Sequence, residues 1–262
     1  GFVMSSNAVR TDDFALTDLE KEMTESSLTG LWAYFDNIYC ISLDEREDRR
    51  RAARNQFDKV GLVDRVEFVI VKKNPVDAEQ GIYESHMACM RTGSAADAQT
   101  MMIFEDDIVF DRFSAAVLTD CIDFLSKTSS WKIFFLGCLV YRSRKTKNRA
   151  VLKVRYRSLT HAYAVERRFA EILVAMPRRK NPYDILLRHV AKDSYAAHPA
   201  FAFQSDARTD NMRLLMLDRF RRMCGGLARI QKMNEWFHHN RLAIIGVHFF
   251  IIVFLLMLAA RA

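Results

Sequence analysis

The sequence contains little of what marks repeat proteins or chains of separate domains. Only four of its 262 residues are proline and nine are glycine. No internal repeat and no Pro/Gly-rich linker divides the chain. The length therefore fits one folded domain with an appendage better than two full domains.

The cysteines give no sign of a disulfide framework or a zinc site. There are five of them, widely spaced, and no two form a CxxC pair. Several lie inside apolar runs, which predicts buried free thiols in a reducing compartment.

The start of the chain carries no secretory signal. It begins with Gly1 rather than Met, which is compatible with an upstream segment. Residues 1–34 are polar, with many Ser, Thr and Asp. They predict a poorly ordered leader with at most one short helix near residues 18–24.

Composition excludes a disordered chain and favours an acidic partner. Half of the residues are hydrophobic, 27% are charged, and 39 basic against 32 acidic residues give a net charge of +7. A sizeable core can form, and the excess of positive charge suits phosphates, anionic lipid or nucleic acid without choosing among them.

One segment is too apolar for a soluble surface. Residues 242–260 contain no Asp, Glu, Lys or Arg, and Arg241 and Arg261 bracket them. As a helix they would be about 28 Å long, close to the ~30 Å core of a bilayer. We predict a transmembrane helix; the alternative is a buried core helix.

The flanks of this segment predict its orientation. Residues 211–240 are basic, whereas only Arg261 follows the span. The positive-inside rule then places the N-terminal domain on the cytoplasmic side of a single-pass membrane protein. Residues 212–236 also mix Leu, Met and Phe with Arg, which predicts an amphipathic helix on anionic lipid or an ordinary basic surface helix.

Between residues 35 and 210, short apolar segments alternate with helical ones. This alternation predicts an α/β fold with a parallel core, in which ligands gather at the carboxyl ends of the strands. Polar clusters beginning at Asp44 and Glu105 both fall at such ends. The predicted strands are 37–43, 66–71, 100–104 and 131–136, and the predicted helices are 46–60, 88–98 and 113–126.

Three adjacent carboxylates, Glu105, Asp106 and Asp107, lie between two apolar runs. Because like charges repel, a nearby cation is the simplest explanation. Hard oxygen ligands suit Mg²⁺ or Mn²⁺ bound together with a diphosphate, whose leaving charge the metal would neutralise. The alternatives are an exposed acidic turn and a metal-dependent hydrolase, but no water-activating constellation accompanies the triplet.

Short motifs recur in a characteristic order over residues 36 to 210. They are YCISLDEREDR at 39–49, GIYESH at 81–86, IFEDD at 103–107, FLG at 135–137, THAYAV at 160–165, and YD at 183–184 with PAFAFQSD at 199–206. Together they resemble glycosyltransferase family 25, the group of lipopolysaccharide and procollagen galactosyltransferase-like proteins. Ser42 departs from the family, which usually has Asn there.

The resemblance implies a GT-A-like nucleotide-sugar-binding fold and a UDP-sugar donor. It puts Glu105 and Asp107 nearest the metal, Mn²⁺ or Mg²⁺, and Asp106 near the donor ribose. For the two arginines of the nucleotide pocket the alternative is an ion pair within their own helix, with Glu45 or Asp48. The implied pocket residues are Ser42, Leu43, Asp44, Arg46 and Arg49.

Two histidines fall within these motifs. His86 follows a predicted turn containing Gly81 and would contact the donor diphosphate or sugar; the alternative is a capping or core histidine. His161 precedes an apolar strand and would supply a metal ligand or line the acceptor site; the alternative is a strand-edge histidine.

Inverting transfer needs a base for the acceptor hydroxyl. The resemblance places a late aspartate at Asp184, and Asp206 is a second candidate. The alternative for Asp184 is a helix N-cap or first-turn aspartate, because Pro182 predicts a helix start.

Residues 142–157 hold eight basic residues and no acidic one. They follow the strand that Gly137 ends, and we expect a loop overhanging the site. A phosphorylated or otherwise acidic acceptor, or a lipid surface, would explain the charge. Tyr141 and Tyr156 are too few aromatics for nucleic acid, and a solvated loop is the alternative.

These features predict a membrane-tethered, metal-dependent hexosyltransferase. It would move a sugar, with galactose favoured, from a UDP-sugar to a surface glycan or lipopolysaccharide-type acceptor, acidic or lipid-linked. The alternative is a catalytically degenerate domain kept as a membrane-anchored binding or scaffold protein.

Overall fold

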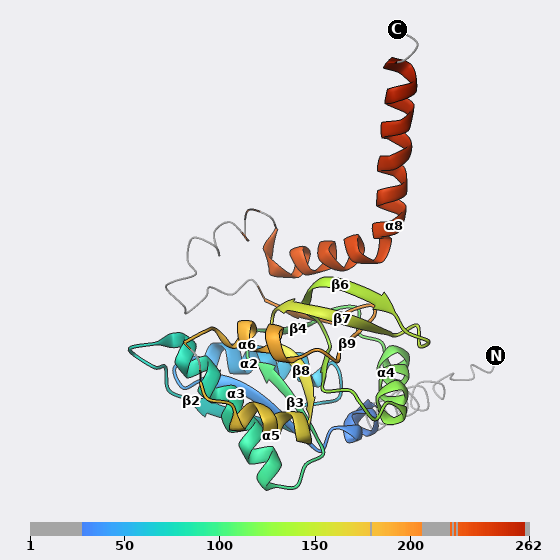
Figure 1. Cartoon of the computed structure of the whole chain (residues 1–262). Coiled ribbons are helices and arrows are strands. Elements are labelled where there is room, and N and C mark those ends of the chain that lie inside the picture. The colour runs from blue at the N-terminus through green and yellow to red at the C-terminus, as the bar shows by residue number, and fades with distance from the viewer. Residues whose placement is uncertain (1–27, 179, 206–220, 222, 224, 260–262) are drawn as a thin grey trace, which may run out of the picture.

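The computed structural model describes residues 28–178, 180–205, 221, 223 and 225–259 (Figure 1). Strands and helices alternate around an eight-stranded mixed sheet of order β2-β1-β3-β8-β5-β9-β7-β6, beside a small β10-β4 pair. The predicted α/β fold is confirmed. The candidate Asp206, the helix predicted near residues 18–24 and most of the leader lie outside the described residues.

The strands are β1 Asn37–Leu43, β2 Val66–Val71, β3 Thr100–Glu105, β4 Ile108–Phe110, β5 Ile133–Phe135, β6 Leu139–Lys145, β7 Val151–Ser158, β8 Ala162–Glu166, β9 Ser194–Ala197 and β10 Ala202–Gln204. The helices are η1 Trp32–Tyr34, α2 Glu47–Asp58, α3 Ala78–Ala95, α4 Ala115–Lys127, α5 Arg167–Ala175, α6 Tyr183–Val190 and α8 Gly226–Ala259. Strands β2, β1 and β3 are parallel, as predicted, and β8 runs antiparallel between β3 and β5.

Both faces of β3 are buried, because its side chains alternate between two cores. Met102 and Phe104 join the core that α2 and α4 cover, and Met101 and Ile103 join the core under α3 and α5. A continuous apolar run is the expected sequence of such a strand. The strand therefore carries its last residue, Glu105, to the edge of a rigid scaffold.

The folded region begins before residue 35, where we expected the domain to start. Trp32 and Phe35 are fully buried, and the Trp32 indole donates a 2.8 Å hydrogen bond to the Val60 carbonyl. The described cysteines Cys40, Cys89, Cys121 and Cys138 are free and buried, as predicted.

The turn predicted before His86 is wrong. The Asp77 carboxylate caps α3 by accepting a hydrogen bond from the Glu79 amide at 3.2 Å, so the helix starts at Ala78 and runs through Gly81 and His86. A cap satisfies amides that the helix leaves unpaired, and it offsets the low helix propensity of one glycine.

The loop predicted at residues 142–157 is also wrong. These residues form most of the β6–β7 hairpin. In β7 the buried residues Val151, Val154 and Tyr156 alternate irregularly with exposed cations. One apolar face is enough to hold a strand on a sheet, whatever the charge of the other face.

The C-terminal helix α8 has two parts. Figure 1 shows it running along β6 and then turning away from the domain. In the first part Gln231 is fully buried and donates to the Ala202 carbonyl at 2.9 Å, while Asn234 bonds both backbone groups of Val140 at 2.9 and 3.1 Å. This part of the predicted amphipathic segment therefore packs on the domain.

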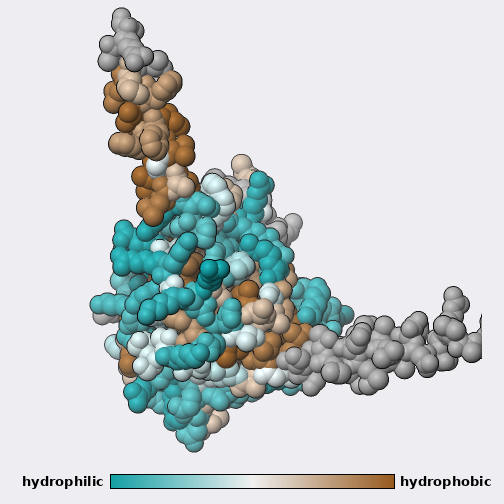
Figure 2. All heavy atoms as spheres, turned by 90° about the vertical axis from the view of Figure 1, so that its right-hand side faces the viewer, coloured by the Kyte–Doolittle hydropathy of each residue, from teal (hydrophilic) through white to brown (hydrophobic). Residues whose placement is uncertain are grey.

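The second part of α8 stands free. Within Gly226–Phe254, α8 is long and apolar enough to cross a membrane, and the 18-residue window that meets this criterion is 0% buried. Leu242 is 76% exposed and Phe250 73%. Figure 2 shows this apolar column rising from a largely hydrophilic domain. The buried core helix considered as an alternative is not what the fold contains.

Candidate functional site

The acidic triplet lies where β3 ends and the chain turns into β4. The Glu105 amide donates to the His161 carbonyl at 3.0 Å, and the Asp106 amide donates to the Ile41 carbonyl at 3.1 Å. The turn is thereby tied to β1 on one side and to the start of β8 on the other. The site thus forms at the carboxyl ends of β1 and β3, as the alternation predicted.

Asp106 is held by two predicted pocket residues. Its carboxylate accepts from the Ser42 hydroxyl at 2.6 Å and lies 3.5 Å from Arg49 Nη1. Burial raises the pKa of Asp106, and the Ser42 bond and the Arg49 charge oppose that rise. The structure brings Ser42, Arg49 and Asp106 into one group, and the Arg49 charge also acts on Asp48 of its own helix.

Arg46 forms the ion pair with Asp48 that was considered as its alternative, and its place in the nucleotide pocket stays a prediction. Its guanidinium pairs with Asp48 at 2.9 Å, and this hydrogen bond lowers the pKa of Asp48 to about 2. The turn after β1 is instead held by Arg50, which contacts the Leu43 carbonyl and donates to the Asp44 carbonyl at 2.9 Å. Sequence reasoning missed Arg50, because a run of three arginines resembles a solvated helix face.

Of the three carboxylates, Asp107 has the fewest partners that stabilise its negative charge among the described residues. Its Oδ2 accepts from Gln204 at 3.2 Å, whereas its Oδ1 is buried and has no hydrogen-bond partner among the described residues. Burial and the neighbouring Glu105 charge raise the pKa of Asp107 to about 8, against the opposing charge of Arg49. The charge of Arg49 therefore compensates Asp107 only in part.

The pKa of Glu105 is shifted in the opposite direction to that of Asp107. Burial raises its pKa, but His86 Nε2 at 3.6 Å and the Thr160 hydroxyl at 2.8 Å outweigh that effect and lower it. About a quarter of its side chain, 26%, remains exposed. The site therefore holds Glu105 ionised beside an Asp107 that resists ionisation.

His86 of α3 contacts the Glu105 carboxylate through its Nε2 atom. It is buried in α3, its Nδ1 lies 3.0 Å from the Tyr163 hydroxyl, and its ring stacks on Tyr183 at 4.4 Å. The two tyrosine hydroxyls are 2.9 Å apart. This is a core histidine, as the alternative proposed, and its second nitrogen faces the site.

His161 directly precedes β8, as a strand-edge histidine would, and its side chain is fully buried. Neither ring nitrogen makes a hydrogen bond of normal geometry with the described residues. Burial lowers the pKa of His161, although the Ala202 carbonyl and the Glu105 charge act in the other direction. A neutral imidazole with unused nitrogens therefore lies close to Glu105.

Asp184 lies in the first turn of α6, and its side chain does not cap that helix. The Tyr156 hydroxyl donates to Oδ1, and the Leu159 amide donates to Oδ2 at 3.4 Å. Burial raises the pKa of Asp184; the Tyr156 bond lowers it and the Glu105 charge raises it further. The negative charge of Glu105 therefore acts on the Asp184 carboxylate.

No family model matches the sequence, and no curated protein matches it. Solved structures of similar shape include A197 from STIV (13% identity, 64% of this chain and 83% of that chain, TM-score 0.42). A glycosyltransferase involved in the glycosylation of the major capsid of PBCV-1 matches at 9% identity, 59% and 75% coverage and a TM-score of 0.35. A putative glucose-1-phosphate thymidylyltransferase from Bacillus anthracis matches at 14% sequence identity, over 72% of this chain and 79% of that chain, with a TM-score of 0.38. At these TM-scores the likenesses carry no argument about chemistry.

Proposed function

We propose that this chain is a membrane-anchored glycosyltransferase that uses a UDP-sugar and a divalent cation. The observation that carries the proposal is the carboxylate turn Glu105–Asp106–Asp107 at the carboxyl ends of β1 and β3, with one buried oxygen of Asp107 unpartnered. The resemblance to glycosyltransferase family 25 supports a hexose donor, with galactose favoured, and a surface glycan or lipopolysaccharide-type acceptor.

The proposed ion is Mn²⁺ or Mg²⁺, and the support for it is a buried carboxylate oxygen without a partner among the described residues. Among the described residues no group of three or more His, Cys, Asp or Glu forms a ready-made cluster. Asp107 nevertheless has a carboxylate oxygen without a partner, and His161 has two unpartnered ring nitrogens. Glu105, Asp107 and His161 would hold the ion, which when bound supplies positive charge for the diphosphate of the leaving UDP.

The chain's own groups would bind and orient the donor. Ser42 and Arg49 fix the Asp106 carboxylate, which would face the ribose. The Arg50 contacts to the backbone of Leu43 and Asp44 keep the turn after β1 in one conformation, so its backbone can line the nucleotide pocket. Such pre-ordered groups are the usual source of positioning in transfer reactions.

Asp184 would take the proton from the acceptor hydroxyl. A raised pKa makes a carboxylate a stronger base, and Tyr156 fixes its orientation. We expect Asp184→Asn to lower kcat by about 10²–10⁴-fold and to leave UDP binding unchanged, since Asn still accepts from Tyr156. Asp123→Asn, in an exposed ion pair with Lys127, is the control. A kcat for Asp184→Asn equal to that of the control would remove Asp184 from this role.

The proposal is tested by titrating the full chain, purified in a neutral detergent, with UDP in the presence and absence of Mn²⁺. Binding that needs Mn²⁺ supports the nucleotide-sugar site and justifies a screen of sugar donors. UDP binding without turnover of any donor would favour the scaffold alternative, and no binding by the folded protein would refute the proposal.

The long exposed helix would anchor the domain to the cytoplasmic face of a membrane. Basic residues gather directly before the span, and the positive-inside rule favours this orientation. In sealed, right-side-out vesicles we expect added protease to leave the domain intact and to remove a tag fused after Ala262. Digestion of the domain from outside would contradict this orientation.

A further inference from the structure

The β6–β7 hairpin places like charges directly opposite each other. Arg142 pairs in register with Arg155, and Arg144 pairs with Lys153. Facing cations destabilise a sheet unless something negative lies between them. Among the described residues only Lys153 of these four has an ion pair, with Asp193 at 3.2 Å. The fold therefore keeps an arrangement that costs stability.

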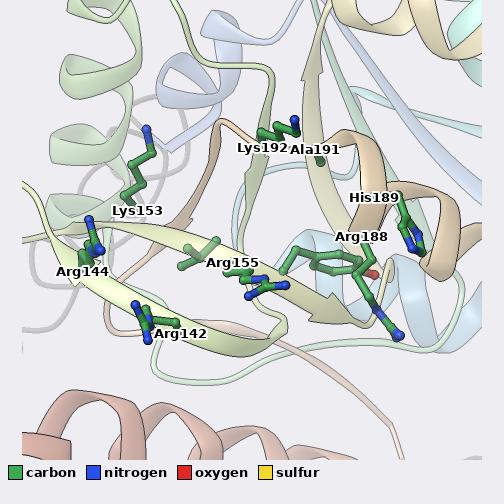
Figure 3. Close-up of a pocket in the computed structure, with 10 residues that line it drawn as sticks. Arg142, Arg144, Lys153, Arg155, Arg188, His189, Ala191 and Lys192 are labelled. Atoms are coloured by element: carbon green, nitrogen blue, oxygen red, sulfur yellow. The ribbon is translucent and has the colours of Figure 1, made fainter.

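These four cations line a cavity of about 490 Å³. Figure 3 shows them along the hairpin, with side chains of α6 and the residues after it on the other side. Arg188, His189 and Lys192 add further nitrogen groups, and no carboxylate is among the lining residues that the structure describes. The size suits a small ligand or a headgroup, and the charge suits phosphate.

Tyr141 contacts three arginine side chains beside this cavity. Tyr141 lies under three guanidinium groups, those of Arg155, Arg157 and Arg188, at 5.8, 5.6 and 5.5 Å from its ring centroid. The Arg188 side chain also donates to the Arg157 carbonyl at 2.8 Å. Cation–π contacts and a backbone acceptor hold the guanidinium groups in place without neutralising them, so their charge remains available to a ligand.

The hairpin lies next to the point where α8 leaves the domain. Val140 of β6, two residues before Arg142, bonds Asn234 of α8. The exposed apolar part of the helix begins at Leu242, two turns later. Figure 1 shows the hairpin beneath the first part of α8, and Figure 2 shows the apolar part of the helix rising from the domain.

We propose that this cavity binds the headgroup phosphate of an anionic membrane lipid. A span in the bilayer brings the hairpin to the lipid headgroups, where a phosphate between Arg142 and Arg155 would neutralise the opposed cations. The choice of lipid over a soluble phosphate rests on α8, whose first part docks on β6 of this hairpin and whose exposed apolar part begins at Leu242. The proposal does not rest on the transferase reaction, but the cavity adjoins the proposed base, because Tyr156 lines the cavity and donates to Asp184.

The test uses the full chain in a neutral detergent and isothermal titration calorimetry. The probes are dihexanoyl phosphatidylglycerol, dihexanoyl phosphatidylcholine and inorganic phosphate. The variant Arg142→Gln with Arg155→Gln removes one opposed pair. Its control, Arg51→Gln with Lys59→Gln, removes the same charge from exposed positions at α2.

We expect the wild type and the control to bind phosphatidylglycerol in preference to the other two probes. The cavity variant should bind it on the order of 30-fold more weakly, which corresponds to the loss of two cations near a lipid phosphate. It should also melt no lower than the wild type, because it relieves a like-charge pair.

Two results would overturn the proposal. Equal weakening in the cavity variant and the control would reduce the effect to net charge. Inorganic phosphate binding as tightly as phosphatidylglycerol would show a site for soluble phosphorylated ligands instead of lipid. If the double variant does not fold, Arg144→Gln alone replaces it, with several-fold weaker lipid binding expected.

Discussion

Replacing Asp107 with Asn is expected to abolish Mn²⁺-dependent UDP binding and to stabilise the metal-free protein at high pH. The pKa of Asp107 is raised from 3.8 to about 8 in the folded protein. A raised folded-state pKa favours the protonated form, so its stabilising effect is present below pH 4 and is lost as pH rises through 8. Asparagine keeps the shape, adds no charge and loses the anionic metal ligand.

The stability gain at pH 9 should be on the order of 1 kcal/mol, because the side chain is only partly buried. This corresponds to about 2–4 °C in Tm for a chain of this size. Calorimetric melts at pH 6 and pH 9 without metal, and UDP titrations with Mn²⁺, measure the two effects. Asp58→Asn, at an exposed position on α2, is the control. Retained Mn²⁺-dependent binding in Asp107→Asn would refute the metal assignment.

Replacing Gly137 with Ala is expected to destabilise the domain and release α8 from it. A Cβ at this position would lie 1.9 Å from the Ala202 carbonyl oxygen and 2.5 Å from Gln231 Nε2. The backbone cannot withdraw easily, since Ala202 is paired in β10 and the Leu136 carbonyl accepts the Phe201 amide. Overpacking of this kind costs roughly 1–3 kcal/mol or more, and the Gln231 hydrogen bond would be lost as well.

Urea unfolding measures the first effect, and hydrogen exchange in residues 226–237 measures the second. Gly30→Ala is the matched control, because a Cβ there meets nothing within 4 Å. We expect faster exchange in this part of α8 only in Gly137→Ala. Equal stability and exchange in the two variants would mean that the contact between Gly137 and α8 does not support docking.

Local patterns were enough to predict the parallel strands and the carboxylate turn. A strand such as β3 is apolar along its whole length, and a cluster of charge directly after it marks the sheet edge. The pairing of Ser42 with Asp106 joins residues 64 apart in sequence, and only the resemblance to a family placed them in one pocket.

The misplaced features depend on one local cap and on contacts between residues far apart in sequence. A helix through Gly81 needs the Asp77 cap, and the cationic hairpin needs the apolar face that Val154 and Tyr156 present to the core. The docking of α8 depends on Gln231 and Asn234, whose partners are backbone groups of distant strands. Polar residues in a basic helix do not reveal such partners.

The docking of α8 also limits where the carboxylate turn can work. Gln231 bonds Ala202 of β10, and Gln204 of the same strand bonds Asp107. Through these two hydrogen bonds, strand β10 connects the first part of α8 to the candidate metal ligand. If α8 anchors the chain in a bilayer, as proposed, the carboxylate turn would be held at a set height above the lipid. An acceptor whose reacting end lies far from that height would then be used poorly.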